Sequence, residues 1–227
     1  MTRGIFVTGT DTGVGKTFVS CVLIYALRQR GLRVAPMKPV AAGAIEVGGN
    51  FVSEDTVALI DACDTPKPAA ALVNPVLFRE PMAPHLAAER EGRTITLEPI
   101  CDAFDTLAAG SDVVLVEGVG GFLVPLGPAL DTRDLAVALR LPVVLVVGLR
   151  LGCLNHALLT AEAIEAAGLT LAGWVANAID PSMAVPDENV AALQARLSAP
   201  LLGRFPFGPG ADPHALADRL HLAPLLG

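Results

Sequence analysis

Aromatic and charged residues are scarce in this chain of 227 residues. Only 4% of the residues are aromatic, with one Trp and one Tyr, and 17% are charged, whereas 52% are hydrophobic. The apolar content is therefore mostly Ala, Leu and Val, which suits parallel strands buried on both faces and flanked by Ala-rich helices. The length suits one large core, so we expect residues 1–227 to form a single domain with one site.

Three further features are missing, and each excludes a class of partner or site. There is no basic cluster, and 16 Lys and Arg against 23 Asp and Glu give a net charge of −7, so nucleic acid is not an expected partner. The start of the chain lacks an apolar signal core, and the apolar run 142–147 is too short to span a bilayer. We therefore expect a cytoplasmic protein without a membrane partner. Cys21, Cys63, Cys101 and Cys153 form no CxxC pair, which favours small buried thiols over a zinc site or disulfides.

Apolar runs alternate with amphipathic stretches along the chain, and no internal repeat is found. Strands are predicted at residues 5–8, 34–38, 113–117, 143–148, 172–177 and 201–205. Helices are predicted at residues 17–30, 53–62, 97–109, 132–140, 154–167, 188–197 and near 213–220. This alternation predicts an α/β fold with a doubly wound, mainly parallel sheet, helices on both faces and ligands at the carboxyl ends of the strands.

Several helix ends carry residues that favour starting or stopping a helix. Gly31 and Gly168 follow two predicted helices, and Ser53 and Thr96 are placed to cap two others. The Pro- and Gly-rich stretches 36–50, 66–84 and 118–128 are then candidate site loops at the sheet edge.

A phosphate-binding loop is the strongest local signal. Residues 9–17 read Gly-Thr-Asp-Thr-Gly-Val-Gly-Lys-Thr and lie between a predicted strand and a predicted helix. Its backbone N–H groups would face a phosphate, Lys16 would reach the terminal phosphates, and the Thr17 hydroxyl would ligate Mg²⁺. The strict motif would place glycine at position 10, where this chain has Thr10, so the loop is a variant of the motif. A plain glycine turn would leave the Gly-Lys-Thr triplet and Asp11 unexplained.

Charged residues end two of the predicted strands. Glu117 ends an apolar strand before a Gly-Val-Gly-Gly segment and is a candidate Mg²⁺ ligand, although a Glu can also simply end a strand at the surface. Lys38 ends another strand and could neutralise charge during phosphoryl transfer, the alternative being a solvated lysine. Asp55, after Ser53, could add a second carboxylate to the metal, or only a favourable charge at a helix start.

Two polar segments further along the chain could bind the rest of a nucleotide or a substrate. The amide of Asn177 offers the donor and acceptor that fit adenine, although Asn also favours the turn before Asp180. The segment 151–155 opens a predicted helix, whose free N–H groups could hold a carboxylate or could simply be solvated.

A set of motifs in order connects these segments to one family. They are FVTGTDTGVGKT at 6–17, KPVAAG at 38–43, EPMAPH at 80–85, VEGVGG at 116–121, LPVVLVVG and LGCLNHALLT within 141–160, and AGWVAN at 172–177. With them the chain resembles dethiobiotin synthetases over nearly its whole length. The resemblance implies a homodimeric P-loop enzyme that closes the ureido ring of dethiobiotin from 7,8-diaminononanoate, CO2 and ATP. A carbamate and then a carbamic-phosphoric anhydride are the implied intermediates.

The resemblance also implies a role for each matching residue. The catalytic residues would be Lys38, Lys16 and Thr12, and the Mg²⁺ ligands would be Thr17, Asp55 and Glu117. The nucleotide would contact Gly13, Val14, Gly15, Lys16, Thr17, Phe18, Asp55, Glu117, Gly118, Val119, Gly120, Asn177, Pro206, Phe207 and Gly208. The diamine would contact Ala42, Gly121, Gly152, Cys153, Leu154 and Asn155, the last four near a subunit interface.

Two residues depart from the family pattern. Ala42 stands where family members often carry Ser or Thr, and Ala83 stands where some have Ser, so each could remove a hydrogen bond to the diamine. The sequence leaves open which amine is carboxylated first and how strictly ATP is preferred over other nucleotides.

Two other functions fit the same loop. One is a MinD- or ParA-like ATPase switch, but such proteins carry a second lysine where this chain has Asp11, and residues 214–220 lack the basic face of a membrane-targeting helix. The other is a cobyrinate-type amide ligase, which usually includes a glutaminase domain for which 227 residues leave no room.

Overall fold

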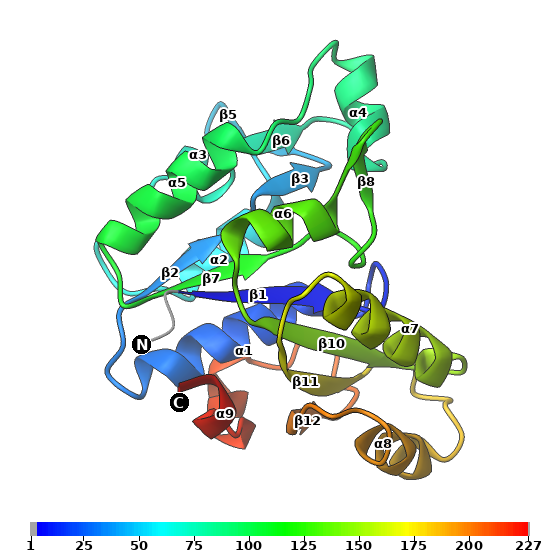
Figure 1. Ribbon diagram of the computed structural model, residues 1–227. Helices are drawn as coiled ribbons and strands as arrows, with labels where there is room; N and C mark the ends of the chain where they lie inside the picture. Colours follow the sequence, from blue (N-terminus) through cyan, green and yellow to red (C-terminus); the bar gives the residue numbers. More distant parts are fainter. Residues whose placement is uncertain (1–3, 227) are drawn as a thin grey trace.

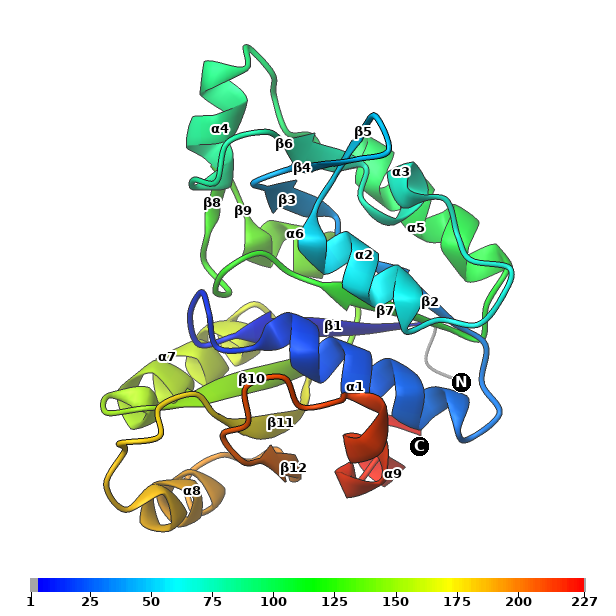
Figure 2. The same cartoon turned by 180° about the vertical axis from the view of Figure 1, so that it is seen from behind.

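The computed structural model describes residues 4–226, and its centre is a parallel six-stranded sheet between two layers of helices (Figures 1 and 2). In spatial order the strands are β12 (Leu201–Phe205), β11 (Leu171–Ala178), β10 (Val143–Leu149), β1 (Gly4–Gly9), β7 (Val113–Glu117) and β2 (Val34–Met37). These are the six strands predicted from the apolar runs. All neighbouring strands pair in parallel, as buried Val-rich strands favour.

Helices cover both faces of the sheet, as predicted. One face packs against α1 (Lys16–Arg28), α2 (Glu54–Asp61), a 3₁₀ helix (His214–Arg219) and α9 (Ala223–Leu226). The other face packs against α5 (Glu98–Ala109), α6 (Thr132–Leu139), α7 (Cys153–Ala166) and α8 (Pro186–Gln194). Figure 2 shows α1 and α2 in front of the sheet, and Figure 1 shows α6 and α7 in front of the opposite face. The doubly wound α/β prediction is confirmed.

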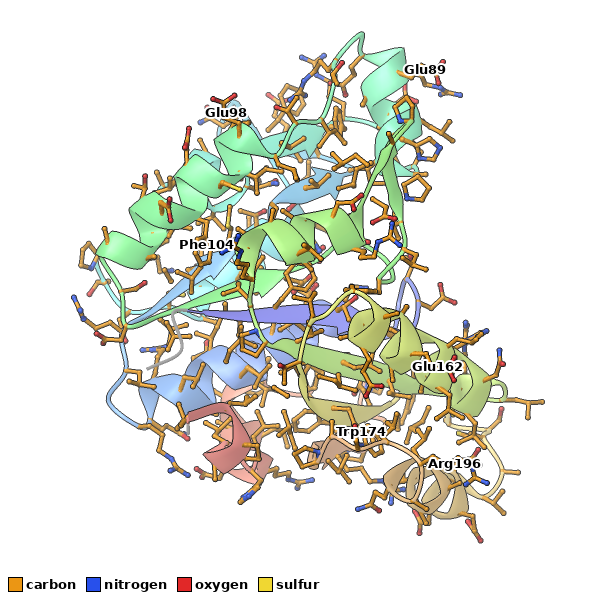
Figure 3. All side chains as sticks on the ribbon, viewed as in Figure 1. Glu89, Glu98, Phe104, Glu162, Trp174 and Arg196 are labelled. Atoms are coloured by element: carbon orange, nitrogen blue, oxygen red, sulfur yellow. The ribbon has the colours of Figure 1, made fainter. Side chains whose placement is uncertain are left out.

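The core consists of two apolar clusters separated by the sheet. Side chains alternate along β1, so Ile5 and Val7 pack in the cluster of α1 and α2, whereas Phe6 packs in the other. Trp174 of β11 is fully buried in the cluster that contains Phe6, whereas Glu162 on α7 and Arg196 just after α8 are exposed on the outside of the molecule (Figure 3). The buried layer on each side of the sheet fixes the strand ends, which carry the site.

Short elements occupy or adjoin the three loops that were predicted to form the site. They are β3 (Val40–Ala42), β4 (Ile45–Val47), β5 (Asn50–Val52), α3 (Ala70–Val73), β6 (Val76–Phe78), α4 (Pro84–Arg90), β8 (Pro125–Gly127) and β9 (Leu130–Asp131). None was predicted, because strands of two or three residues and helices of four and seven residues are too short to show a clear periodicity. β3 pairs with β6, so the loops 36–50 and 66–84 lie side by side.

The predicted helix ends are confirmed at three of four positions. Ser53 accepts a hydrogen bond from the Thr56 N–H at 3.0 Å, and Gly31 and Gly168 adopt positive φ just after α1 and α7. The Thr96 cap is wrong: α5 begins at Glu98, and Leu97 holds the capping position without a side-chain bond. Pro lies in the first turn of α5 and lacks an N–H for a capping side chain to bind.

The structure also bears on the predictions of buried free thiols and of no membrane-spanning segment. All four cysteines are free; Cys21, Cys63 and Cys153 are buried as predicted, whereas Cys101 is partly exposed. Within residues 4–226, every helix is too short or too polar to cross a bilayer.

Candidate active site

The candidate site lies at the carboxyl edge of the sheet, where strands from both halves of the chain meet. β1 is central: β7 and β2 lie on one side of it, and β10, β11 and β12 lie on the other. Ligands of doubly wound sheets bind where the strand order reverses in this way. The loop after β1, the end of β7 at Glu117 and Lys38 just after β2 all lie at this edge.

The loop after β1 leads directly into α1. Gly13 and Gly15 have φ of +75° and +84°, a backbone conformation that side chains rarely adopt. A Cβ on Gly15 would lie 2.2 Å from Nδ2 of Asn177, so the loop also needs the missing side chain for space. α1 starts at Lys16 without a side-chain cap, which leaves N–H groups of its first turn available to an anion.

Several long-range contacts hold this loop in place. The Thr10 N–H donates to the Val146 carbonyl at 3.0 Å, and Asn177 Nδ2 donates to the Val14 carbonyl at 2.9 Å. Asn177 is 7% exposed and lies inside β11, so its interpretation as a turn residue is wrong. The loop is therefore tied to β10 and β11 before any ligand binds.

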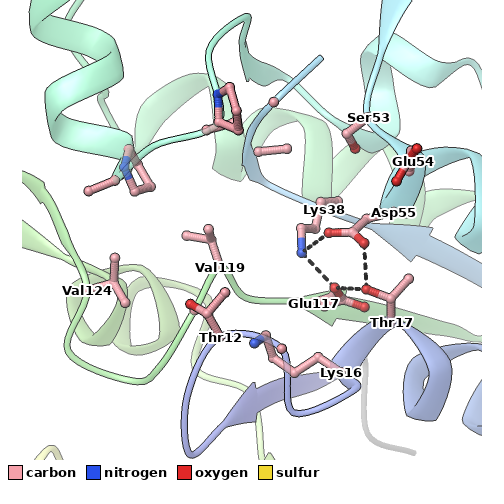
Figure 4. Close-up of a pocket in the computed structure, with 18 of the residues that line it drawn as sticks. Thr12, Lys16, Thr17, Lys38, Ser53, Glu54, Asp55, Glu117, Val119 and Val124 are labelled. Carbon is pink, nitrogen blue, oxygen red and sulfur yellow. Dashed lines mark hydrogen bonds and ion pairs between the residues drawn. The ribbon is translucent and has the colours of Figure 1, made fainter. Parts of the chain in front are cut away.

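A buried charge cluster lies beside the loop (Figure 4). The Lys38 ammonium lies 2.6 Å from Glu117 Oε1, 2.8 Å from Asp55 Oδ2 and 3.3 Å from the Gly118 carbonyl oxygen. Thr17 Oγ1 lies 2.7 Å from Asp55 Oδ1 and 2.9 Å from Glu117 Oε1, so its single hydrogen serves one carboxylate at a time. Lys38 is 3% exposed and Glu117 is 0% exposed, which excludes both the solvated lysine and the surface strand end.

The charges of the cluster shift the pKa values of its members. Burial opposes the charge of Lys38, but the Glu117 and Asp55 carboxylates outweigh it and raise the pKa of Lys38. Burial likewise opposes the charge of Asp55, but Lys38 and the Thr17 hydroxyl lower the pKa of Asp55. Burial, and after it the Lys38 ammonium, lower the pKa of Lys16 to about 8. With a raised pKa on Lys38 and a lowered pKa on Asp55, both groups of this ion pair are charged near neutral pH.

Asn74 positions Lys38 and was missed by the sequence reasoning. Its Nδ2 donates to the Lys38 carbonyl at 2.7 Å, and the Lys38 N–H donates to the Val73 carbonyl at 2.8 Å. Asn74 belongs to none of the quoted motifs, and nothing local indicates that it lies beside a lysine far away in sequence.

The cluster forms one wall of a cavity of about 760 Å³. Of the residues assigned by the resemblance, it is lined by Thr12, Gly13, Gly15, Lys16, Thr17, Lys38, Ala42, Asp55, Glu117, Val119 and Gly120, and Ala83 lines it as well. The remaining lining residues had no predicted role: Ala41, Gly43, Ser53, Glu54, Pro81, Met82, Pro84 and Val124. All three predicted site loops contribute residues to the lining of the cavity. The motif at 80–85 is the sequence feature that could have indicated Pro81, Met82 and Pro84.

The residues assigned to adenine form a second group outside this cavity. The Phe18 ring packs edge-on against Phe205, with ring centroids 5.7 Å apart, and Phe205 pairs with Asn177 across β12 and β11. The exposed segment 206–208, which contains Pro206, Phe207 and Gly208, follows directly. Val14, whose carbonyl Asn177 binds, connects this group to the loop.

The residues assigned to the diamine carboxylate lie apart from the cavity. Gly152 caps α7 with φ of +95° and no side-chain bond, and Cys153, Leu154 and Asn155 form the first turn. Leu151, just before them, is 94% exposed. Gly121 is also outside the cavity, where its carbonyl accepts from the Thr132 hydroxyl at 3.1 Å. The structure therefore brings only Ala42 of the six assigned diamine residues into the cavity.

A glycine loop after a central parallel strand, with Lys16 and Thr17 opening the next helix and an acid ending the adjacent strand, defines a P-loop nucleotide-binding protein. Solved structures agree on this fold at low sequence identity. The septum site-determining protein MinD of Pyrococcus horikoshii, in complex with Mg-ADP, is 19% identical with a TM-score of 0.57, and 92% of this chain and 83% of that chain are covered. A ParA family ATPase from Chlorobium tepidum is 16% identical with a TM-score of 0.52, covering 91% and 85%.

Sequence comparison identifies the family. A family model described as an AAA domain matches residues 3–215. An ATP-dependent dethiobiotin synthetase from Aromatoleum aromaticum is 54% identical over 220 residues, which cover 97% of both chains. Another from Ralstonia nicotianae is 54% identical over 97% of this chain and 96% of the relative, and one from Xylella fastidiosa is 52% identical over 95% and 96%. This chain belongs to the ATP-dependent dethiobiotin synthetase family.

Proposed function

We propose that this enzyme closes the ureido ring of dethiobiotin from 7,8-diaminononanoate, CO2 and ATP, as a step of biotin biosynthesis. The observation that carries the proposal is the cluster of Lys38, Asp55, Glu117 and Thr17 on the wall of a cavity at the phosphate loop, in a chain of this family. A MinD- or ParA-like switch shares the fold but is not favoured, because that likeness rests on identities below 20%.

We assign the nucleotide to the loop and to the Phe18–Asn177 side of the site. Backbone N–H groups of 13–17 would bind the phosphates. Val119 and Gly120, which line the cavity, and Gly118 just before them would contact the nucleotide as well. Asn177 and the segment 206–208 would hold adenine; the second N–H and the oxygen of the Asn177 amide remain for the base while its first N–H binds Val14.

The residues around Glu117 fit Mg²⁺. Thr17, Asp55 and Glu117 provide a hydroxyl and two carboxylates, and Mg²⁺ in phosphate sites typically takes one or two carboxylates and fills the rest with water and phosphate. Glu117 Oε2 is buried without a hydrogen-bond partner, which a metal would supply. Within residues 4–226, no group of three or more His, Cys, Asp or Glu side chains forms a protein-only metal cage, consistent with a metal held jointly with a phosphate. When bound, Mg²⁺ would neutralise the charge on the terminal phosphates.

The chain's own cations would act on the reacting groups. In the proposed sequence one substrate amine attacks CO2 to give a carbamate, and a carbamate oxygen takes the γ-phosphoryl group while ADP leaves. The second amine then attacks the carbonyl carbon and expels phosphate. Lys38 and Lys16 would stabilise the negative charge that gathers between the carbamate and the γ-phosphoryl oxygens, and the Thr12 hydroxyl would orient them.

The cavity leaves room for the diamine beside Ala42, with Pro81 and Met82 as further walls. We propose that the start of α7 binds the carboxylate of the diamine and that it belongs to the partner subunit of a homodimer. Two observations support this. The start of α7 lies outside the cavity of its own chain, and Leu123, Leu151 and Leu159 are 53%, 94% and 57% exposed around α7 and the loop after β7. We further propose that residues 1–227 form one domain, which acts in the cytoplasm.

The proposal is tested by the mass of the product. Incubating the protein with 7,8-diaminononanoate, bicarbonate and Mg-ATP should give dethiobiotin, with one ADP and one phosphate for each ring closed. ATP hydrolysis that does not depend on the diamine, with no dethiobiotin formed, would contradict the proposed reaction and favour the ATPase switch.

A further inference from the structure

The loop assigned to the phosphates contains an acidic residue, Asp11, whose negative charge acts on the nearby Lys16 ammonium. Asp11 lies two residues after Gly9, and its own backbone carbonyl accepts from Lys16 Nζ at 3.1 Å. Lys16 is the residue assigned to the terminal phosphates, so the Asp11 backbone lies within hydrogen-bond distance of the group that would hold them. A free carboxylate at this position would repel a triphosphate.

The structure provides a partner for that carboxylate from far along the chain. Arg150 Nη2 pairs with Asp11 Oδ2, while Asp11 Oδ1 accepts from the Thr12 N–H at 2.7 Å. Arg150 follows β10 and lies two residues before Gly152, the residue that caps α7. The pair therefore joins the phosphate loop to the segment that starts α7.

The exposure of the pair shows that overall stability is not its main effect. The side chains of Arg150 and Asp11 are 41% and 46% exposed, and pairs of this kind contribute roughly 0–1 kcal/mol to folding. Its effect is local: both oxygens of Asp11 are occupied, and its negative charge is neutralised beside the phosphate site.

We propose that Arg150 is a positioning residue for the nucleotide, which neutralises Asp11 and holds the phosphate loop against the start of α7. The proposal deepens the function proposed above and rests on it only for the assignment of the loop to ATP. Without Arg150, the unpaired Asp11 carboxylate opposes the phosphates. Without both residues, the repulsion is gone as well.

A double-mutant cycle on ATP affinity, measured by calorimetry, tests this. Arg150→Met should raise the Kd for ATP roughly fivefold, the upper end for a half-exposed pair, and Arg150→Lys should restore most of the affinity because it keeps the charge. Asp11→Asn combined with Arg150→Met should return the Kd to within about twofold of the parent, which independent effects would not do. Melting temperatures should stay close to the parent in all variants.

Arg33→Met is the matched control. Arg33 pairs with Asp112 just before β2 and β7, at the opposite end of the strands, so it loses the same charge from an exposed ion pair without touching the loop. Three results would overturn the proposal: an unchanged Kd in Arg150→Met, a double variant as weak as Arg150→Met, or an equal effect of Arg33→Met. ATP binding is measured without diamine, so this test does not depend on the proposed reaction. A parent protein that binds ATP but makes no dethiobiotin would refute the proposed reaction, and the double-mutant cycle would still test the role of Arg150.

Discussion

Lys38 and Glu117 form an ion pair of 2.6 Å that is almost completely removed from water, with side-chain exposures of 4% and 0%. Removing one partner of such a pair leaves an uncompensated buried charge, which typically costs about 3–5 kcal/mol. Asp55 at 2.8 Å gives Lys38 a second partner, whereas Glu117 is left with the Thr17 hydroxyl if Lys38 is lost. Substitutions at Lys38 and at Glu117 therefore differ in their effect on stability. A test of catalysis at either residue has to separate lost stability from lost turnover.

Lys38→Met should nearly abolish phosphate release that depends on the diamine. It keeps the length of the side chain but removes the cation proposed to stabilise the transferring group, a loss that typically lowers kcat by about 10²–10³. The Kd for ATP, measured by calorimetry, should change little, because Asn177 and the loop are assigned to the nucleotide.

Its control addresses the buried charge that Lys38→Met leaves behind. Combining it with Glu117→Gln should recover much of the lost melting temperature without recovering turnover. Near-parental phosphate release in Lys38→Met with diamine and bicarbonate would show that the lysine has no catalytic role.

Glu117→Gln should sharply raise the Mg²⁺ concentration needed for half-maximal turnover, by roughly tenfold or more, since ligand charge sets much of the affinity of such sites. Lys38 keeps Asp55 as a partner, so the fold should tolerate this change better than Lys38→Met. Glu54→Gln is the control, because Glu54 lines the same cavity without a role at the metal. An Mg²⁺ dependence equal to that of the parent would mean that Glu117 only balances Lys38.

Ala42→Ser should lower the KM for the diamine and leave kcat nearly unchanged. Ala42 lines the cavity, and a hydroxyl there would add a hydrogen bond that is equally strong in the ground state and the transition state. Ala44→Ser, two residues on and outside the lining, should change neither constant. A large change in kcat at constant KM would contradict the assignment of Ala42 to ground-state binding.

Gly15→Ala should weaken ATP binding far more than Gly31→Ala. Both residues have similar φ, +84° and +80°, so the backbone strain is matched. Only Gly15 has a close neighbour, since its Cβ would lie 2.2 Å from Asn177 Nδ2, whereas a Cβ on Gly31 meets nothing within 4 Å. Displacing Asn177 breaks its bond to Val14, worth up to about 1.5 kcal/mol or roughly tenfold in affinity. Equal effects of the two variants in calorimetry would rule out this role of Asn177.

Light scattering should give about twice the chain mass of 23.4 kDa at assay concentration. Leu159→Asp, on the exposed apolar surface of α7, should shift the protein toward the monomer and reduce turnover with the diamine, while ATP affinity is retained. Val57→Asp on α2, at the opposite face of the sheet, should remain a dimer. A fully active monomer would contradict the proposed contribution of the partner's α7.

The sequence by itself determined the sheet and the chemistry at its edge. The six central strands were predicted because each is a short apolar run, and in β7 and β10 the run is mostly Val. β1 with its glycine loop and Lys16 is a local pattern that depends on neighbouring residues only. Glu117 and Lys38 were placed at the site because parallel strands all end at the same edge of a doubly wound sheet.

Only the tertiary structure decided which of these residues touch. Lys38 and Glu117 are 79 residues apart, Asp11 and Arg150 are 139 apart, and Val14 and Asn177 are 163 apart. Their contacts depend on the spatial order of the strands, which leaves no periodic trace in the sequence. For the same reason Asn177 was open to interpretation as a turn residue, and Asn74, which holds the backbone of Lys38, was not found. Strand ends can be predicted from local composition, whereas the partner across the site is set by how the sheet is wound.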